Sequence, residues 1–509
     1  MCIRDRLIIA NSKTANRSTS IINDRDTMNE KVAQLAPSEV WTWFEKLNAV
    51  PRPSKKEERV IAFIQGVGAE LGLETLTDDA GNVIIRKPAT SGKENATPVI
   101  LQAHLDMVHQ KNSDTEFDFD SQGIESWIDG EWVKAKGTTL GADNGMGVAS
   151  ILAVLASKEI EHGPIEGLFT IDEETGMTGA FELQSGLLQG KILLNTDTED
   201  EGELTIGCAG GIDSTVVIDC QSSAPTGGTW MKISVTGLRG GHSGCEIHLG
   251  RGNANKIMNR ILLAAQNADV SAKIGSIRGG SLRNAIPRES FAVVNVADEA
   301  AFKTLVSETV AAIKGELSDA DPELLVEVES GDATAEVLEP SFQKSLLAAI
   351  DGSPCGVIQM SDQVEGLVET STSLSLVGID ANKATIEFLT RSSVEPAKGK
   401  VTASIETAFA AINPNVTHSG DYPGWAPNAN SKTLALMEGI YQEMFGKKAT
   451  VNAVHAGLEC GIIGSHYPGL DMVSLGPTIK NPHSPDEMCH IESVEKYWRY
   501  LLEILKRIE

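Results

Sequence analysis

The sequence predicts an α/β protein whose layered core is interrupted by an α+β module. Apolar strand-like runs alternate with helix-like runs between residues 38 and 197, an order typical of a layered α/β core. From about Ile212 the order changes to strand, helix, strand, helix and strand, and the core pattern returns at Ser431. We therefore expect a core built from two separate parts of the chain, with a second unit inserted between them.

The first part of the core is expected to begin with two amphipathic helices. The spacing of apolar residues predicts a helix with Ser38 as its N-cap, which Pro51 and Pro53 end. A second helix is expected over residues 57–71. Apolar runs then predict strands at 82–86, 99–108, 167–174 and 191–197, and a helix at 148–156. In such cores, ligands bind at the ends of strands.

The inserted unit contains two passes of similar order. The first pass has predicted strands at 230–235, 290–296 and 324–328 and helices at 255–266 and 299–317. The second has helices at 343–350 and 398–412 and strands at 373–378 and 384–390. Because the passes share order rather than sequence, we interpret them as an internal duplication. The core resumes with a helix at 431–445, a strand at 471–475 and a closing helix from about residue 493.

Length and composition restrict the class of protein. A chain of 509 residues is too long for one ordinary core. We expect core segments at 28–211 and 422–509 around an insertion at 212–421. Residues 1–27 match nothing that follows, so we interpret them as a non-native or disordered extension with Met28 as the initiator. A targeting extension is the alternative.

The balance of charge argues against nucleic acid and anionic membranes as partners. The chain has 43 Lys and Arg against 70 Asp and Glu, a net charge of −27, whereas both partners require a basic surface. Seven scattered cysteines without a C-x-x-C pair favour a reducing compartment, so we expect a cytoplasmic protein. No apolar run reaches the length of a membrane helix.

Residues that bind metals follow the predicted strands. His104 and Asp106 lie two residues apart at the end of one strand, so their side chains would share a face. A carboxylate beside a histidine orients it as a metal ligand, although a buried structural pair fits equally well. Asp197 follows another apolar run, where burial of an unpaired carboxylate is costly.

The full set of such residues is typical of a site for two metal ions. The positions are His104, Asp143, Glu173 with Glu174, Asp197 and His483, and two histidines with three carboxylates suit Zn²⁺ or Mn²⁺. If Glu173 and Glu174 alternate faces, one can be a ligand while the other acts as a base. Asp143 is the best bridging residue, and the alternative is that its Gly-rich turn only caps a helix.

Several motifs together resemble the dimetal M20 peptidase family. In chain order they are His104-Leu-Asp106, Gly141-Ala-Asp-Asn-Gly145, Asp172-Glu-Glu-Thr-Gly176, Asn195-Thr-Asp197 and Asn481-Pro-His-Ser-Pro-Asp-Glu487. Further motifs resemble its aminoacyl-histidine dipeptidase branch: Gly240-Gly-His-Ser-Gly244, Arg283-Asn-Ala-Ile-Pro-Arg288 and His455-Ala-Gly-Leu-Glu-Cys-Gly461. The resemblance implies a phosphorylase/hydrolase-like α/β catalytic domain with an inserted α+β lid and dimerisation domain.

The resemblance also implies how the metal ligands divide. One ion would be held by His104, Asp143 and Asp197. The other would be held by Asp143, Glu174 and His483. The peptide bond Asp143–Asn144 would be cis, because family members often have a cis bond after the bridging aspartate.

Other residues would act around the metals by the same resemblance. Asp106 would orient His104, and Glu173 would take a proton from the attacking water and pass it to the leaving amine. His242 would stabilise the oxyanion from the lid, with a turn histidine as the alternative. Arg391 would clamp the substrate carboxylate.

The predicted substrate is a small peptide, and two side chains complete its expected contacts. Asn284 would add a polar contact. Glu459 could receive the free amine, and a structural glutamate fits equally well. The lid would form a homodimer.

The resulting prediction is a cytoplasmic metallo-dipeptidase that cleaves Xaa-His dipeptides such as β-alanyl-histidine and broader dipeptides. It would use two divalent cations, with Zn²⁺ favoured over Mn²⁺ or Co²⁺. An aminoacylase, a tripeptidase or a carboxypeptidase on the same scaffold is the nearest alternative. A non-catalytic, metal-stabilised binding protein is the other.

Overall fold

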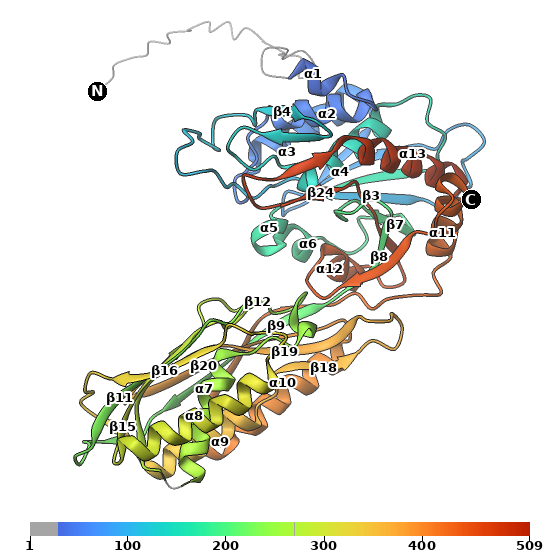
Figure 1. Cartoon of the computed structure of the whole chain (residues 1–509). Coiled ribbons are helices and arrows are strands. Elements are labelled where there is room, and N and C mark those ends of the chain that lie inside the picture. Colours follow the sequence, from blue (N-terminus) through green and yellow to red (C-terminus); the bar gives the residue numbers. More distant parts are fainter. Residues whose placement is uncertain (1–28, 269) are drawn as a thin grey trace, which may run out of the picture.

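The computed structural model describes residues 29–268 and 270–509, so the predicted extension over residues 1–27 lies outside the described residues, as does Met28. Figure 1 shows two bodies, a rounded one that contains both ends of the described chain and an elongated one attached to it. The rounded body is built around one mixed sheet and the elongated body around another. We call them the core and the lid.

The core sheet has parallel strands at its centre, which is what places the functional residues together. In the described part of the chain it has eight strands, in the spatial order β1 (Glu74–Thr77), β2 (Val83–Lys87), β6 (Ile165–Thr170), β3 (Val99–His104), β7 (Ile192–Asn195), β23 (Asp471–Ser474), β8 (Glu203–Cys208) and β22 (Thr450–Val454). Strand β3 runs parallel to both β6 and β7. The carboxyl ends of these three strands therefore meet at one edge of the sheet.

Both faces of the core sheet are covered, so its strands are apolar on both sides. Side chains such as Leu101 and Phe169 pack in one cluster with helices α2 (Ser38–Asn48), α3 (Glu58–Leu71), α4 (Ala142–Ala156), α11 (Lys432–Phe445) and α13 (Ile491–Arg507). Their neighbours Ile100 and Leu168 point the other way, into a second cluster with α6 (Thr178–Glu182) and α12 (Glu459–His466). The core is a three-layer α/β/α structure.

Two predicted boundaries in the core were wrong. Ser38 is the first residue of α2, and the N-cap position is taken by Pro37, which has an extended backbone and whose carbonyl accepts from Val40 and Trp41. The strand predicted at 99–108 ends at His104, because Met107 leaves β6 and its N–H donates to the carbonyl of Arg52.

A third correction bears on the site. The strand predicted at 167–174 ends at Thr170, and Glu173 and Glu174 lie on a single helical turn, α5 (Glu173–Gly176). The two glutamates therefore do not alternate across a strand. Asp172, just before this turn, has a left-handed backbone with φ 54°, which turns the chain out of the sheet.

A small sheet at one side of the core completes it. Its strands are β24 (Ile479–Lys480), β25 (Met488–His490), β5 (Trp132–Ala135) and β4 (Ser126–Asp129). The turn between β24 and β25 carries His483 and Glu487. A short helix α1 (Glu30–Ala33) precedes α2. Within the described residues, every helix is too short or too polar to cross a lipid bilayer.

The lid consists of two halves with the same βαββαβ order. The first half contains β11 (Thr229–Thr236), α7 (Ala254–Asn267), β13 (Ala272–Gly279), β15 (Ser290–Val296), α8 (Glu299–Glu316) and β16 (Leu325–Ser330). The second contains β9 (Gly210–Asp219), α9 (Pro340–Gly352), β19 (Val368–Ile379), β20 (Lys383–Ser392), α10 (Glu395–Phe409) and β21 (Asn415–Tyr422). The first half lies between β9 and α9 in the chain.

The spatial order of the strands shows the same repeat. Each half has its fourth strand beside its first, followed by the third and then the second. The two second strands, β13 and β19, pair antiparallel and join the halves into one sheet, with α7 to α10 along one side (Figure 1). The duplication inferred from the sequence is thus a repeat of topology.

Several lid strands were missed by the sequence analysis, and the three longest are β9, β13 and β21. β13 contains Gly275 and Gly279, and β9 begins with Gly210 and Gly211, so both lack the dense apolar pattern of a buried strand. β21 is an edge strand of mostly exposed, polar residues. Shorter pairs, β12 (Gly241–His242) with β14 (Ala285–Ile286) and β10 (Ser222–Ser223) with β17 (Val337–Leu338), and strand β18 (Gly356–Met360) complete the lid.

Candidate metal centre

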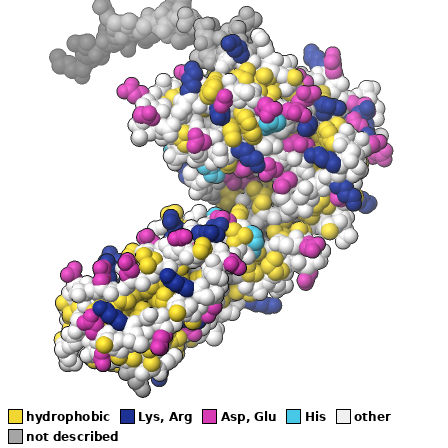
Figure 2. All heavy atoms as spheres, in the orientation of Figure 1, with side chains coloured by type: hydrophobic (Ala, Val, Ile, Leu, Met, Phe, Trp, Pro, Cys, Tyr) yellow, Lys and Arg dark blue, Asp and Glu magenta, His cyan; other side chains and the backbone are white. Residues whose placement is uncertain are grey.

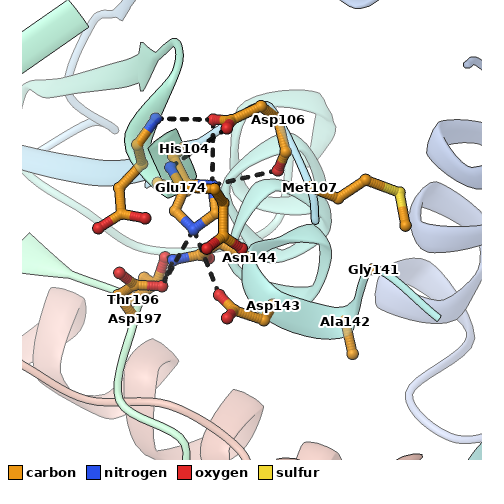
Figure 3. A network of polar contacts seen from close by, with 12 residues as sticks. His104, Asp106, Met107, Gly141, Ala142, Asp143, Asn144, Glu174, Thr196 and Asp197 are labelled. Atoms are coloured by element: carbon orange, nitrogen blue, oxygen red, sulfur yellow. Dashed lines mark hydrogen bonds and ion pairs between the residues drawn. The ribbon is translucent and has the colours of Figure 1, made fainter. Parts of the chain in front are cut away.

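Three neighbouring strands deliver the first groups of the site. His104 is the last residue of β3, and its backbone lies beside Thr170 at the end of β6. Asp197 follows β7, two residues after its end at Asn195. The His104 ring is buried, and its Nε2 lies 3.2 Å from Asp143 Oδ1 and 3.5 Å from Asp197 Oδ1. Figure 3 shows both contacts.

Asp143 lies between two histidines. Its Oδ1 faces His104 and its Oδ2 lies 3.2 Å from Nε2 of His483. The peptide bond Asp143–Asn144 is cis, as predicted, and both residues have non-helical backbones at the start of α4. Each oxygen of this carboxylate can therefore serve a different ion, which is the geometry of a bridging ligand.

The structure brings together the same two ligand groups that the sequence predicts. His104, Asp143 and Asp197 present ligand atoms within 4.8 Å of one another, and so do Asp143, Glu174 and His483. The His483 imidazole lies 3.0 Å from Glu174 Oε2. These two groups share Asp143, so two adjacent ion positions would have one carboxylate in common.

The residues fit a pair of divalent cations. Glu174 Oε1 is buried and has no hydrogen-bond partner among the described residues, an arrangement that costs free energy unless a cation lies there. Burial raises the pKa of Asp197, His104 opposes this effect, and the neighbouring Asp143 carboxylate adds to it. Hydrogen bonds that the His483 imidazole donates to the carboxylates of Asp143 and Glu174 raise its pKa to about 11. A bound cation would relieve this accumulation of carboxylates.

Asp106 organises the site in two ways. His104 Nδ1 lies 3.1 Å from the Asp106 carbonyl and 3.4 Å from its Oδ1. The carboxylate also accepts hydrogen bonds from the backbone N–H groups of Glu173 at 3.0 Å and Glu174 at 3.3 Å. One buried side chain therefore fixes both the histidine and the turn with the two glutamates.

Glu173 lies next to the ligands. One of its oxygens is within 4.8 Å of ligand atoms of His104 and Glu174. Burial raises the pKa of Glu173 well above its usual range, His104 opposes this effect, and Asp197 and Glu174 add to it. A raised pKa is consistent with the role of general base that the family resemblance implies for Glu173.

Two supporting residues were not singled out by the sequence analysis. The Glu487 carboxylate accepts four backbone N–H groups, from Leu140 at 2.7 Å, Gly141 at 2.9 Å, Ala142 at 2.7 Å and Asp143 at 3.2 Å. It thereby fixes the turn that presents Asp143. The one sequence signal for this role of Glu487 was its position at the end of the motif Asn481-Pro-His-Ser-Pro-Asp-Glu487.

The second supporting residue is the buried Arg52. Its Nη2 donates to the Gly141 carbonyl at 2.6 Å, and its Nη1 donates to the carbonyls of Leu105 and Asp106 at 3.3 Å each. Arg52 thus ties the end of β3 to the turn that carries Asp143. Nothing in the sequence around Arg52 indicates this role, because its partners lie more than fifty residues away.

The lid residues gather near the junction of the two bodies. His242 Nδ1 accepts from the N–H groups of Gly244 at 3.2 Å and Cys245 at 2.9 Å, and its Nε2 lies 3.5 Å from Arg391 Nη2. Burial and the Arg391 charge lower the pKa of His242 to about 4. The exposed Asn284 lies beside the same loop, and its backbone carbonyl accepts from the Ser243 N–H at 2.8 Å.

Arg391 belongs to β20, in the other half of the lid. Its side chain is 5% exposed and its Nη1 donates to the Tyr422 hydroxyl at 2.9 Å. The Arg391 Nε is buried and has no acceptor among the described residues. Tyr422 was missed by the sequence analysis, because an isolated tyrosine at the end of a polar strand carries no signal.

His455 and Glu459 lie on the core side of the junction. His455 Nε2 is 2.7 Å from the Ser371 hydroxyl of the lid, and a Cβ at Gly244 would approach the His455 carbonyl to 2.1 Å. Glu459 is 1% exposed, and its Oε2 accepts from Gln102 Nε2 and Thr170 Oγ1 at 2.7 Å each. The structure therefore places Glu459 beneath the ligands rather than at a surface open to solvent.

The surface of the molecule is hollowed between the core and the lid. Figure 2 shows this hollow, with histidine side chains on both of its sides and acidic side chains on the core above it. The lid loop with His242 faces the core across the junction, since Gly244 lies against His455.

A layered α/β core with two histidines and several carboxylates at its strand ends, joined to an inserted lid, is an architecture of dimetal hydrolases. Residues 100–507 match peptidase family M20/M25/M40, and the chain belongs to that family. It is 45% identical over 481 residues to the cytosol non-specific dipeptidase of Escherichia coli strain K12, covering 94% of this chain and 99% of the relative.

Solved structures agree with this assignment. The crystal structure of aminoacylhistidine dipeptidase from Vibrio alginolyticus superimposes with a TM-score of 0.89 at 46% identity, covering 94% of this chain and 98% of that one. The aminopeptidase PepT of Bacillus cereus has the same fold, with a TM-score of 0.56 at 16% identity over 95% of this chain and 99% of that one. The fold predicted from the sequence is confirmed.

Proposed function

We propose that this chain is a metal-dependent dipeptidase that hydrolyses Xaa-His dipeptides, such as β-alanyl-histidine, and a broader range of dipeptides. The observation that carries this proposal is the pair of ligand groups that share Asp143, with Glu173 beside them. The Escherichia coli and Vibrio relatives, which carry dipeptidase names, support it over nearly the whole chain.

The ligands are proposed to divide as the two groups do. His104, Asp143 and Asp197 would hold one cation, and Asp143, Glu174 and His483 the other. When bound, the two cations would lower the pKa of a shared water and polarise the scissile carbonyl.

The remaining groups at the site would move the protons. Glu173 would accept the proton of the attacking water and deliver it to the leaving amine. Asp106 would keep His104 and the turn of Glu173 in position, since it contacts the imidazole and accepts from the Glu173 N–H. The low pKa of His242 keeps its imidazole neutral, so it would donate one N–H to the oxyanion.

The lid would recognise the carboxylate end of the dipeptide. The buried Nε of Arg391 meets no acceptor within residues 29–268 and 270–509, and its planar guanidinium group suits a carboxylate. Asn284, on the adjacent exposed loop, would add a polar contact. Glu459 was the predicted receiver of the amine, and its burial favours the structural alternative.

Zn²⁺ is the proposed metal, because histidine and carboxylate ligands suit it, and Mn²⁺ or Co²⁺ would fit the same donors. The proposed compartment is the cytoplasm, in agreement with the name of the Escherichia coli relative. The proposed partner is a small peptide substrate alone, since the strongly acidic chain disfavours nucleic acid and anionic membranes.

A homodimer through the lid, formed by residues 212–421, also remains a proposal. Strand β18 pairs with β19 along one side only, and its side chains Val357, Ile358 and Met360 are exposed. An apolar edge strand of this kind is a site at which chains associate. Ile358→Lys should therefore shift the mass measured by light scattering from dimer to monomer, whereas Lys383→Glu, on the surface of β20, should leave it unchanged.

The decisive experiment compares substrates on one enzyme preparation. Chelator-treated protein is reloaded with Zn²⁺, Mn²⁺ or Co²⁺ in turn and assayed with β-alanyl-histidine, other dipeptides, tripeptides and N-acetyl amino acids. We expect kcat/KM to be highest for dipeptides. Strong deacylation with weak dipeptide cleavage would instead identify an aminoacylase, and preference for longer peptides a tripeptidase or carboxypeptidase.

One variant distinguishes the proposed enzyme from a non-catalytic, metal-stabilised binding protein. Glu173→Gln keeps the size of the side chain and removes the base, so turnover should fall by about 10²- to 10⁴-fold while both metals stay bound. The conservative exchange of the exposed Glu182 to Gln is the matched control. Unchanged turnover in Glu173→Gln with bound metal would refute the mechanism.

A further inference from the structure

One arginine in the lid has no assigned role although its motif stood out in the sequence. Arg283 opens the motif Arg283-Asn-Ala-Ile-Pro-Arg288. It lies in the turn that leads into β14, within the first half of the lid, and is half-buried. Its contacts cross from this half of the lid to the other.

The second half of the lid holds both the side chain and the backbone of Arg283. The guanidinium Nη1 lies 2.7 Å from Asp213 Oδ2, Nε donates to Glu387 Oε2 at 2.7 Å, and Nη2 donates to Thr215 Oγ1 at 3.3 Å. The Arg283 carbonyl accepts from the buried Ser375 Oγ of β19 at 2.6 Å. A planar guanidinium with an acceptor at each nitrogen is fixed in direction as well as in place.

The same turn holds the lid loop that carries His242. Ala285 of β14 pairs antiparallel with His242 of β12. The Asn284 carbonyl accepts from the Ser243 N–H at 2.8 Å. Because the loop is bonded to the two residues that follow Arg283, a displacement of the turn would displace His242.

Strand β20 connects the ion pair of Arg283 to Arg391. Arg391 follows Glu387 by four residues on β20, and the pairing of β20 with β9 is continuous between them, so both side chains lie on the same face of the lid sheet. His242 Nε2 and Arg391 Nη2 approach each other only to 3.5 Å, too long for a contact that holds them in place by itself. The bond from Arg283 to Glu387 joins the loop of the one to the strand of the other.

We propose that Arg283 is a positioning residue that keeps the His242 imidazole and the Arg391 guanidinium aligned on one substrate. This inference rests on the proposed dipeptidase function and extends it to a residue that acts through those two. Arg391 is also held within the sheet and by the Tyr422 hydroxyl, whereas His242 is carried by a loop. Loss of the Arg283 contacts would therefore affect the chemical step, which His242 serves, more than the binding of the substrate carboxylate.

The test separates kcat from KM in the metal-loaded protein. Wild type, Arg283→Gln, Arg283→Lys and Glu387→Gln are assayed with the dipeptide that the wild type cleaves best, and with a phosphinic dipeptide isostere, a mimic of the tetrahedral oxyanion, as inhibitor. Arg260→Gln is the matched control, because Arg260 makes two bonds to Glu316, at 2.6 and 2.7 Å, on the helical side of the same half (Figure 1). Metal content and the unfolding midpoint are measured for each protein.

We expect Arg283→Gln to lower kcat about 10- to 100-fold and to raise the inhibition constant of the isostere by a similar factor, while KM changes less than about threefold. Arg283→Lys can keep one ion pair and Glu387→Gln removes one, so both should show the same pattern to a smaller extent, and they test the proposal if Arg283→Gln does not fold. Arg260→Gln should keep the wild-type kcat.

Three results would overturn the proposal: an unchanged kcat in the variants of Arg283 and Glu387, a rise in their KM at constant kcat, or an equal loss of kcat in Arg260→Gln. The last result would show that any broken ion pair of the lid has this effect. A wild type that cleaved no dipeptide would refute the proposed function separately, before any variant is compared.

Discussion

The carboxylate of Glu487 should determine both the stability of the core and its affinity for metal. It accepts four backbone N–H groups from the turn that presents Asp143. In Glu487→Gln the amide keeps one acceptor oxygen and turns an NH₂ group toward two of these donors. Two charge-assisted hydrogen bonds are lost, at about 1.5–3 kcal/mol each, and relief of the buried charge offsets part of the cost.

We therefore expect Glu487→Gln to lower the free energy of unfolding by about 2–4 kcal/mol and metal affinity by about 10- to 100-fold. Denaturant unfolding of the metal-free protein measures the first quantity, and competition with a chromophoric chelator measures the second. The control is Asp486→Asn, at the adjacent exposed carboxylate. If Glu487→Gln matched that control in both measurements, the turn would not depend on the carboxylate.

Three further outcomes follow from other parts of the molecule. His162 is fully buried, its Nε2 has no partner in the described part of the chain, and burial lowers its pKa. On acidification the unfolded chain therefore takes up a proton before the folded protein does. The free energy of unfolding should fall by about 1.4 kcal/mol per pH unit as the pH drops below about 6.5, until the pH reaches the folded-state pKa. Stability curves against pH should be flatter in this range for His162→Gln but not for the exposed His109→Gln. Mixing inactive Glu173→Gln with inactive His242→Ala should restore no activity, since the His242 loop contacts the core of its own chain; recovered turnover would show that sites are completed between chains. Removing the metals should abolish turnover, and it should lower the unfolding midpoint because the ligand carboxylates then repel one another. Adding Zn²⁺ back should reverse both effects. An unfolding midpoint that does not respond to the chelator would contradict this expectation.

That the metal ligands gather at one edge of the core could be predicted from local patterns in the sequence, whereas their division between two ions was implied by the family resemblance. His104 and Asp197 follow apolar runs, and parallel strands bring such ends together. Asp143 stands in a Gly-rich turn before an apolar helix. Each of these signals lies within a few neighbouring residues, so it can be recognised without knowledge of the fold.

Contacts between distant segments could not be predicted in this way. Glu487 meets the turn of Asp143 across more than three hundred residues, and Arg52 meets Gly141 across 89 residues. The direction of the Glu173 side chain depends on where strand β6 ends. The acidic residues that follow β6 do not show where that end lies. Strand β13 was missed because packing against β15 and β19, rather than its own composition, makes it a strand.

The repeated lid has a consequence for how its two halves can change. In each half, the connection from first strand to first helix is an insertion: one carries His242 and the other carries the entire first half. His242 and Arg391 thus come from different halves of one chain and meet at a single place. If the two halves were instead identical subunits encoded by one sequence, every substitution would occur in both of them. Here each half can vary by itself, so the chemistry that faces one end of a substrate can be altered while the other end keeps its contacts.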